Sequence, residues 1–242
     1  NLDAGQADAA EARPRDALIG WWRFDEPGGK EALDASGNGL HGALRGYDSE
    51  KIERCKGVRG RAVMLSGRHG GYVHVPHHPK LDITGPLTLT AWVRRLRYTR
   101  GGPGLPAVAG KGYSTRRNGA YSLHLRQETK LWFELDDNED NRQTHTTQFK
   151  PETASVAPFV WTHLAVTWDG KKQRMFINGR MHGKPRDFAG RIRTTNTPLT
   201  IGYLPGCSVF YGAIDEVRLY ARSLSHDEIL ADVGKGFAAL DD

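Results

Sequence analysis

The apolar segments of this chain are short, and turn-forming residues bound nearly all of them. After Leu18, each apolar segment spans about four to nine residues and ends near Gly, Pro, Asn or Asp. This spacing is typical of an all-β sandwich or barrel. No segment approaches the ~20 apolar residues of a membrane-spanning helix, and long β-α-β alternation is absent. We therefore expect an all-β protein without membrane insertion and exclude doubly wound and TIM-barrel enzymes.

The segment 161–178 shows the strand pattern most clearly. In WTHLAVTWD the side chains alternate between two faces, and Asp169-Gly170 follows as a turn before QRMFIN. Asn178-Gly179 then supplies a second turn. Asp-Gly and Asn-Gly pairs favour the positive φ angles of tight hairpins, so the two turns predict a meander of antiparallel strands. The same criterion predicts strands at 18–24, 61–65, 71–75, 86–94, 120–126, 130–135, 198–202 and 211–220.

One short helix is predicted near the end of the chain. Ser225 and Glu228 have the spacing of a capping box, in which each side chain bonds the backbone N–H of the other residue. Gly234 is expected to end this helix, because glycine is common just after a helix C-terminus. An apolar stripe lies between these signals, at Ile229, Leu230 and Val233.

The beginning of the chain differs in composition from the rest. Residues 1–17 are small or charged and show no hydrophobic periodicity, which is typical of a tail or linker. Residues 18–242 are predicted to form one domain, either within a larger protein or as a monomer.

Opposite charges are concentrated in two segments. Residues 94–126 contain eight Lys or Arg and no acid, whereas residues 134–140 contain five acids. Arginine binds carboxylate or sulfate groups through paired hydrogen bonds, and the interleaved tyrosines could stack on sugar rings. A glycan-binding loop at 99–119 is one interpretation of the net charge of +6. The alternative is a solvated loop whose arginines pair with the acids of 134–140.

Motifs of several other function classes are missing. No GxSxG or GKS/T sequence is present, so a nucleophile-elbow hydrolase and a P-loop protein find no support. Nucleic-acid-binding motifs are also absent. Tyr121 is expected on the strand face opposite His124 and Arg126, which argues against a lyase that aligns these side chains. Cys55 and Cys207 allow either one disulfide or two free thiols.

Seven motifs follow one another along about residues 18–233: WRFDE, DASGNGLHG, GYVHVP, LTLTAWV, WTHLAVTWDGKKQRMFINGR, PLTIG and GAIDEVRLYARSLSHDEI. Their order resembles that of the laminin-G-like (concanavalin A-like) jelly-roll family. The resemblance implies a jelly-roll sandwich of two antiparallel sheets, with the N- and C-terminal strands adjacent in one sheet. It also implies a structural Ca²⁺ beside those strands.

Four residues are candidate ligands of that Ca²⁺. Calcium takes about six to eight hard oxygen ligands, often from a loop and from one or two carboxylates. The Gly-rich turn offers Asp34 and Asn38, and the strand that the family places near the first one carries Asp215. Asp25 is a further candidate. The alternative is that Asp34 and Asn38 form an Asx-type turn by bonding their own backbone.

The acidic segment is similar to a catalytic signature. Glu134-x-Asp136-x-x-Glu139 resembles the E-x-D-x-x-E pattern of laminarinase-like glycoside hydrolases, which share the jelly roll and use two carboxylates. The two residues before Glu139 are polar here, whereas that family has apolar ones. A strand crowded with carboxylates is unfavourable, so we expect the chain to leave the sheet after Leu135. A solvated hairpin loop is then the simpler interpretation.

Together these features predict a non-catalytic carbohydrate-binding or adhesion module that is secreted or at the cell surface, whether extracellular or periplasmic. The expected partner is a polysaccharide or glycoconjugate, with an anionic glycan favoured, and not nucleic acid. Two alternatives stay open, because one fold hosts many functions: a glycoside hydrolase or polysaccharide lyase that uses Glu134, Asp136 and Glu139, and a structural accessory domain without a ligand. No catalytic residue is assigned. The ligand is expected to contact Tyr113, Arg116, Arg117, Tyr121, Asp136, Asp140 and Tyr211.

Overall fold

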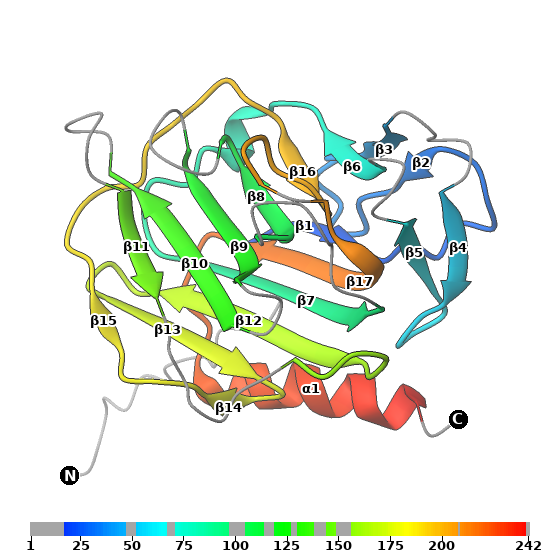
Figure 1. Ribbon diagram of the computed structural model, residues 1–242. Coiled ribbons are helices and arrows are strands. Elements are labelled where there is room, and N and C mark those ends of the chain that lie inside the picture. Colours follow the sequence, from blue (N-terminus) through cyan, green and yellow to red (C-terminus); the bar gives the residue numbers. More distant parts are fainter. Residues whose placement is uncertain are drawn as a thin grey trace, which may run out of the picture.

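The strands form two antiparallel sheets that stack face to face, and an α-helix lies against the outer side of one of them (Figure 1). The two-sheet antiparallel sandwich expected from the sequence is therefore confirmed. The expected tail at 1–17 lies outside the described residues except for Ala17. This computed structural model describes residues 17–46, 52–66, 71–96, 105–113, 119–126, 130–137, 144–148, 156–207 and 209–240.

The nine-stranded sheet contains strands from both ends of the domain. Strand β1 (Leu18–Trp22) pairs with β17 (Tyr211–Tyr220), so the N- and C-terminal strands are neighbours, as the family resemblance implied. Strand β15 (Arg186–Asp187) pairs with β13. The order of the other strands is β14 (Arg180–Met181), β13 (Lys172–Ile177), β12 (Thr162–Trp168), β7 (Leu87–Arg95), β17, β5 (Arg61–Ser66) and β4 (Glu53–Lys56).

The eight-stranded sheet lies toward the viewer in Figure 1. A short 3₁₀ helix at Pro79–Leu81 follows its strand β6. The order of the strands is β11 (Thr144–Gln148), β10 (Lys130–Asp136), β9 (Tyr121–Arg126), β8 (Ala107–Lys111), β16 (Leu199–Ile201), β6 (Tyr72–Val75), β3 (Gly42–Arg45) and β2 (Glu31–Ala32).

The hydrophobic core lies between the two sheets. Side chains alternate across each strand, so Leu164, Val166 and Trp168 of β12 point into the same cluster as Leu123 and Phe133 of the opposite sheet. Every residue of β12 is nevertheless buried, because the helix covers the other face of its sheet.

Both predicted turns flank β13. Asn178 and Gly179 have φ angles of 49° and 75°, as expected for an Asn-Gly hairpin turn. At the other turn, Asp169 accepts the backbone N–H groups of Lys171 and Lys172 at 2.8 and 2.7 Å. The meander predicted for 161–178 is therefore confirmed.

The helix α1 (His226–Leu240) begins as predicted and is longer than expected. Ser225 donates its N–H to Glu228 and accepts the N–H of Glu228 in return. Gly234 does not end the helix, because the buried stripe continues to Gly236, which lies against the Trp92 ring. No helix in the described part of the chain has the length and hydropathy needed to cross a bilayer.

Strand β8 corrects the prediction of a solvated loop at 99–119. Residues 107–111 are fully buried in the middle of the eight-stranded sheet, between β9 and β16. The small residues of AVAGK lack the β-branched and aromatic signal of the other strands. Their position is set by the neighbouring strands.

Candidate functional site

The outer face of the eight-stranded sheet carries a row of polar side chains. On β9, Leu123 and Leu125 point into the core, so Ser122 and His124 point outward. Strand β10 pairs Glu134 with Ser122, and the same alternation places Glu134 and Asp136 on the outer face. The chain therefore stays in the sheet through Asp136, one residue beyond the predicted exit at Leu135.

Ser122, His124, Glu134 and Cys207 form a hydrogen-bonded cluster on this face. His124 Nε2 lies 2.6 Å from Ser122 Oγ and 3.2 Å from Glu134 Oε2. Ser122 Oγ also donates to Glu134 Oε2 at 3.2 Å. On the other side of the ring, Cys207 Sγ lies 3.4 Å from His124 Nδ1. The imidazole is therefore held at both nitrogens.

The protonation of His124 follows from these partners. Burial alone would lower the pKa of its imidazole, but the hydrogen bonds and electrostatic interactions with Cys207 and Glu134 raise that pKa to about 9. At neutral pH the ring is therefore an imidazolium with both nitrogens protonated. The ring is almost completely buried, so solvent screens its charge little.

Tyrosine rings lie beside this cluster. Tyr72 alternates with the core residues Val73 and Val75 on β6, so its ring points outward, 5.2 Å from the ring of Tyr203. Burial raises the pKa of Tyr203, and Tyr72, Cys207 and Tyr113 raise it further. These effects place all three groups near Tyr203. Tyr203 and Cys207 belong to the same loop, so the two tyrosine rings lie on the same side of the sheet as the His124 cluster, and we call this surface the tyrosine face.

Asp136 lies at the end of β10, close to Arg193. Its Oδ2 is 3.9 Å from Arg193 Nη1, and its carbonyl accepts the N–H of Arg193 at 2.8 Å. Its N–H donates to the carbonyl of Ala120 at 3.0 Å. Asp136 is largely buried, so it also anchors the loop that contains Arg193.

The structure describes four of the seven predicted ligand-binding residues, and these four do not all lie on one surface. Tyr113 is exposed and lies near the tyrosine face. The prediction for Tyr121 is wrong, because the alternation of β9 points this ring into the core, where its hydroxyl donates to the carbonyl of Leu81 at 3.0 Å. Tyr211 is half-buried at the start of β17, in the other sheet. Three further predicted residues, Arg116, Arg117 and Asp140, lie outside the described residues.

Three basic residues of the 94–126 segment bind the protein itself. Lys111 Nζ is 3.1 Å from Asp82 Oδ1 and donates to the carbonyl of Thr197 at 3.0 Å. Burial lowers the pKa of Lys111, and Asp82 opposes this shift. Arg95 donates to a carbonyl inside the sandwich, and Arg94 lies over the Trp161 ring. These three side chains therefore contact other parts of the protein, whereas those of an anion-binding loop would face solvent.

Asp34 forms the Asx-type turn that the alternative interpretation described, whereas the Asn38 side chain bonds groups far away in the chain. The Asp34 carboxylate accepts the N–H groups of Trp21, Ser36 and Leu40 and the hydroxyl of Ser36, all within 3.0 Å. Asn38 donates to two carbonyls of β1. Its Oδ1 accepts Lys80 Nζ at 2.6 Å.

Asp215 and Asp25 both contact the turn between β4 and β5. The register of β17 shifts after Asp215, and the buried Asp215 carboxylate accepts the N–H groups of Val58, Arg59 and Glu216. Burial raises the pKa of Asp215 to about 8. Asp25 accepts the N–H of Arg61 at 2.8 Å.

The four predicted calcium ligands therefore do not fit a common ion as they are placed. Their carboxylates point at backbone N–H donors, and Asn38 is bound to a lysine. Within the described residues, no group of three or more His, Cys, Asp or Glu side chains could hold a metal. Calcium stays a prediction, to be tested in solution.

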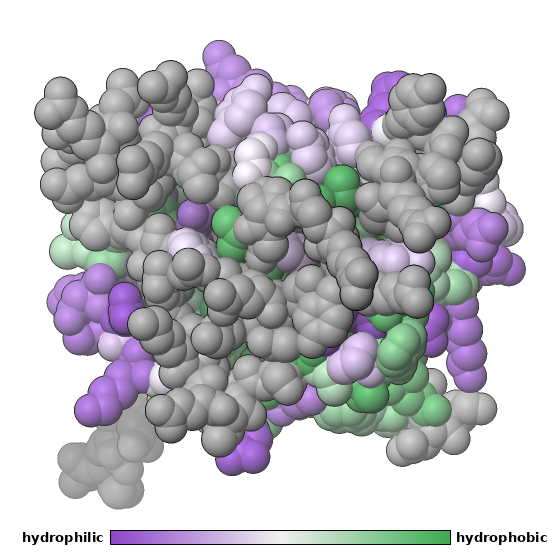
Figure 2. Space-filling model, viewed as in Figure 1, coloured by the Kyte–Doolittle hydropathy of each residue, from purple (hydrophilic) through white to green (hydrophobic). Residues whose placement is uncertain are grey.

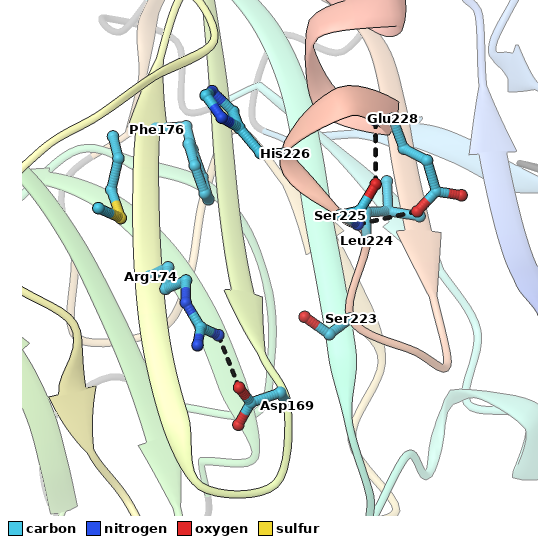
Figure 3. Close-up of a pocket in the computed structure, with 9 residues that line it drawn as sticks. Asp169, Arg174, Phe176, Ser223, Leu224, Ser225, His226 and Glu228 are labelled. Carbon is cyan, nitrogen blue, oxygen red and sulfur yellow. Dashed lines mark hydrogen bonds and ion pairs between the residues drawn. The ribbon is translucent and has the colours of Figure 1, made fainter.

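A pocket of about 520 Å³ lies on the helix side of the nine-stranded sheet (Figure 3). Arg174 pairs with Asp169 at 2.7 Å, and the His226 ring stacks on Phe176 while its Nε2 lies 2.7 Å from the carbonyl of Gly179. The pocket thus lies between the turn at Asp169, which is held by an ion pair, and the capped start of α1. We assign it no ligand. Its lining is Asp169, Arg174, Phe176, Met181, Ser223, Leu224, Ser225, His226 and Glu228.

The sequence interpretation did not identify most of the tyrosine face. Tyr72 and His124 alternate with core residues on strands that the sequence predicted, so the outward direction of each was readable from the pattern. Tyr203 and Cys207 lie in the loop between β16 and β17, and only the fold brings that loop to β6 and β9.

Comparison with known proteins agrees with this architecture. A family model for the concanavalin A-like lectin/glucanases superfamily matches residues 66–230. A search of curated proteins found no match.

Solved structures with the same architecture include toxin and glycosidase domains. The binding domain of Paraclostridial mosquitocidal protein 1 has a TM-score of 0.70 and 15% identity, over 91% of this chain and 52% of that one. Domain 4 of AbnA, an extracellular GH43 arabinanase from Geobacillus stearothermophilus, was solved with arabinotriose; its TM-score is 0.64 and its identity 21%, over 89% of this chain and 97% of that one. The binding domain of botulinum neurotoxin DC, solved with rat synaptotagmin II, has a TM-score of 0.65 and 15% identity, over 92% and 52%. This chain spans about half the length of the two toxin binding domains, and at these identities the likeness shows the fold alone.

Proposed function

Because the chain belongs to the concanavalin A-like lectin/glucanases superfamily, we propose that it is a non-catalytic carbohydrate-binding module of a secreted or cell-surface protein. Its glycan lies on the tyrosine face of the eight-stranded sheet. Domain 4 of the extracellular arabinanase supports this proposal, since it has the same fold and was solved with an oligosaccharide.

The observation that carries the proposal is the half-exposed pair of Tyr72 and Tyr203. Their rings lie 5.2 Å apart at an angle of 46°, and neither is fully buried. A tyrosine offers an apolar face to a sugar ring and a hydroxyl for a hydrogen bond. The exposed Tyr113 extends this surface.

The contacts of the two acids favour binding over hydrolysis. A retaining glycosidase needs two carboxylates ~5–5.5 Å apart, both facing the sugar. Glu134 is buried and bonded to Ser122 and His124, and Asp136 is buried beside Arg193. The third acid of the hydrolase pattern, Glu139, lies outside the described residues.

Glycan-array screening followed by calorimetry on the bound glycan tests the proposal. We expect Tyr72→Ala and Tyr203→Ala each to weaken binding at least about tenfold. Phe159→Ala is a matched control, because Phe159 is an exposed aromatic residue that precedes β12 in the other sheet; its affinity should equal that of the wild type.

Two outcomes would contradict the proposal. Absence of affinity for every glycan, with an intact fold, would favour a structural accessory domain. Release of reducing ends that is lost in Glu134→Gln would show a hydrolase instead.

A preference for anionic glycans is the finer part of the proposal. The net charge of +6 supports it, although Arg94, Arg95 and Lys111 bind within the protein. If the preference holds, affinity for a sulfated or uronic glycan falls as salt rises, whereas affinity for a neutral one is unchanged.

A further inference from the structure

The tyrosine face contains a Cys–His–Glu arrangement that glycan binding does not require. Cys207 Sγ faces one nitrogen of His124 at 3.4 Å, and Glu134 Oε2 faces the other at 3.2 Å. A nucleophile bonded to an imidazole, which a third group orients, is the geometry of an activated nucleophile. The arrangement is therefore more than an isolated cysteine.

The backbone around Cys207 forms a hydrogen-bonded turn. Its N–H donates to the carbonyl of Leu204 at 2.9 Å, Leu204 is buried, and Gly206 takes a positive φ of 88° at the turn. Cys207 itself is half-buried. The sulfur is thus held against His124 and keeps one side toward solvent.

The charge of His124 acts directly on this sulfur. His124 Nδ1 lies 3.4 Å from Cys207 Sγ, and a protonated Nδ1 in this position stabilises the negative charge of the sulfur as it reacts. The other titratable groups near the pair are Glu134, which orients the ring, and Tyr203, which burial keeps neutral by raising its pKa.

Cys55 provides an internal comparison. It is also a free thiol and also half-buried, on β4 of the other sheet. Burial raises the pKa of the Cys55 thiol, although Arg94 opposes this effect. The protein therefore has one cysteine, Cys207, beside an imidazole and another, Cys55, whose thiol is kept protonated by burial.

We propose that Cys207 is a nucleophile, activated by His124 and positioned through Glu134, that forms mixed disulfides with low-molecular-weight disulfides. The Cys207 sulfur attacks one sulfur of the disulfide, whose S–S bond breaks as the new one forms. The electron pair leaves with the departing thiolate, which takes a proton from the imidazolium or from water. One disulfide is consumed and one is formed, and the departing sulfur ends as a thiol once it has taken the proton, so no other oxidant is needed.

This inference does not rest on the proposed glycan binding. It assigns a chemical reactivity to the same face, and either proposal can fail without the other.

The test measures the reaction of each cysteine with the neutral reagent 2-hydroxyethyl disulfide, using mass spectrometry of quenched samples. At about pH 5.5, few ordinary thiols are ionised. We expect Cys207 in the folded wild-type protein to react at least about tenfold faster than the same cysteine in denaturant, and Cys55 to react more slowly than in denaturant. This comparison needs no variant, so it holds even where a substitution impairs folding.

Variants then assign the cause. Cys55→Ser should leave the rate at Cys207 unchanged, whereas His124→Gln should lower it at least about tenfold at about pH 5.5. Glu134→Gln tests a positioning residue: the rate at Cys207 should regain the steep rise with pH of an ordinary thiol, while circular dichroism stays native. The proposal is overturned if folded Cys207 reacts no faster than the denatured thiol, or if folded His124→Gln keeps the wild-type rate.

Discussion

At the scale of single residues, several side chains that the sequence marked for ligands instead hold the backbone. Asp34 and Asp215 each accept three backbone N–H groups. Lys111 binds two loops. Tyr121 is buried in the core and donates its hydroxyl to the carbonyl of Leu81. These polar side chains stabilise the fold instead of binding a ligand, because each buried backbone N–H or C=O group needs a hydrogen-bond partner.

Asp34→Ala tests this role. The change leaves three backbone N–H groups without their acceptor, so we expect the free energy of unfolding to fall by about 3 kcal/mol. Asp34→Asn keeps one acceptor oxygen and should cost about 1 kcal/mol. Urea denaturation measures both. Equal stability of Asp34→Ala and wild type would contradict the role.

His124 should make stability depend on pH. Its pKa is raised in the folded protein, to about 9, relative to the ordinary value of 6.5. The folded state therefore holds the proton more tightly, and the resulting stability is complete below about pH 6.5 and is lost as pH rises toward about 9. The change amounts to at most about 3 kcal/mol.

Urea denaturation across this pH window compares the wild type with His124→Gln, which lacks the titrating group. The wild type should lose more stability than the variant between about pH 6.5 and 9. Parallel curves would show that the imidazole is not held in its charged form.

At the scale of elements, patterns with a strong local signal were predicted well. The strands with alternating apolar residues and the capping box of α1 appear within one or two residues of their expected bounds. Strand β8 was missed, since its small residues carry no such signal. The end of α1 was missed because Gly234 suggested a stop, whereas packing of Phe237 on Trp92, at 5.3 Å between ring centroids, extends the helix.

The two glycines of α1 give a matched pair of substitutions. Nothing lies within 4 Å of a Cβ at Gly234, so Gly234→Ala should stabilise the protein by about 1 kcal/mol through helix propensity. A Cβ at Gly236 would lie 2.2 Å from the buried Trp92 ring, so Gly236→Ala should destabilise by about 2 kcal/mol.

Thermal and urea denaturation measure both glycine variants. Both substitutions replace glycine by alanine in the same helix, so the gain in helix propensity is similar at both sites. The difference between the two changes in stability therefore reports the contact with Trp92. The same sign of change at both positions would contradict the docking of α1 against Trp92.

At the scale of the whole molecule, the sandwich has two different outer faces. Helix α1 covers the nine-stranded sheet, where His163 and Arg218 contact Asp232. The eight-stranded sheet presents the tyrosine face. In the view of Figure 2, hydrophobic surface gathers at the lower right, where the segment before β12 and the end of α1 lie. Exposed Phe159, Val160 and Phe237 come from those two segments.

Calcium is tested on the intact molecule. The side chains proposed as ligands already accept hydrogen bonds, so we expect neither chelator nor millimolar Ca²⁺ to shift the melting temperature by more than about 1 °C. A larger stabilisation by Ca²⁺ would show that the turns rearrange around an ion, and would restore the prediction made from the family resemblance.

The sequence alone determined the strands with alternating apolar residues, the turns, the helix start and the two-sheet class, because these depend on periodicity and on residues near one another in the chain. The tertiary structure decided which polar residues meet. His124, Glu134 and Cys207 come from two strands and a distant loop, and Tyr72 meets Tyr203 across the sheet. Such contacts depend on strand order and on which face each side chain takes, and one-residue differences in register reverse that face.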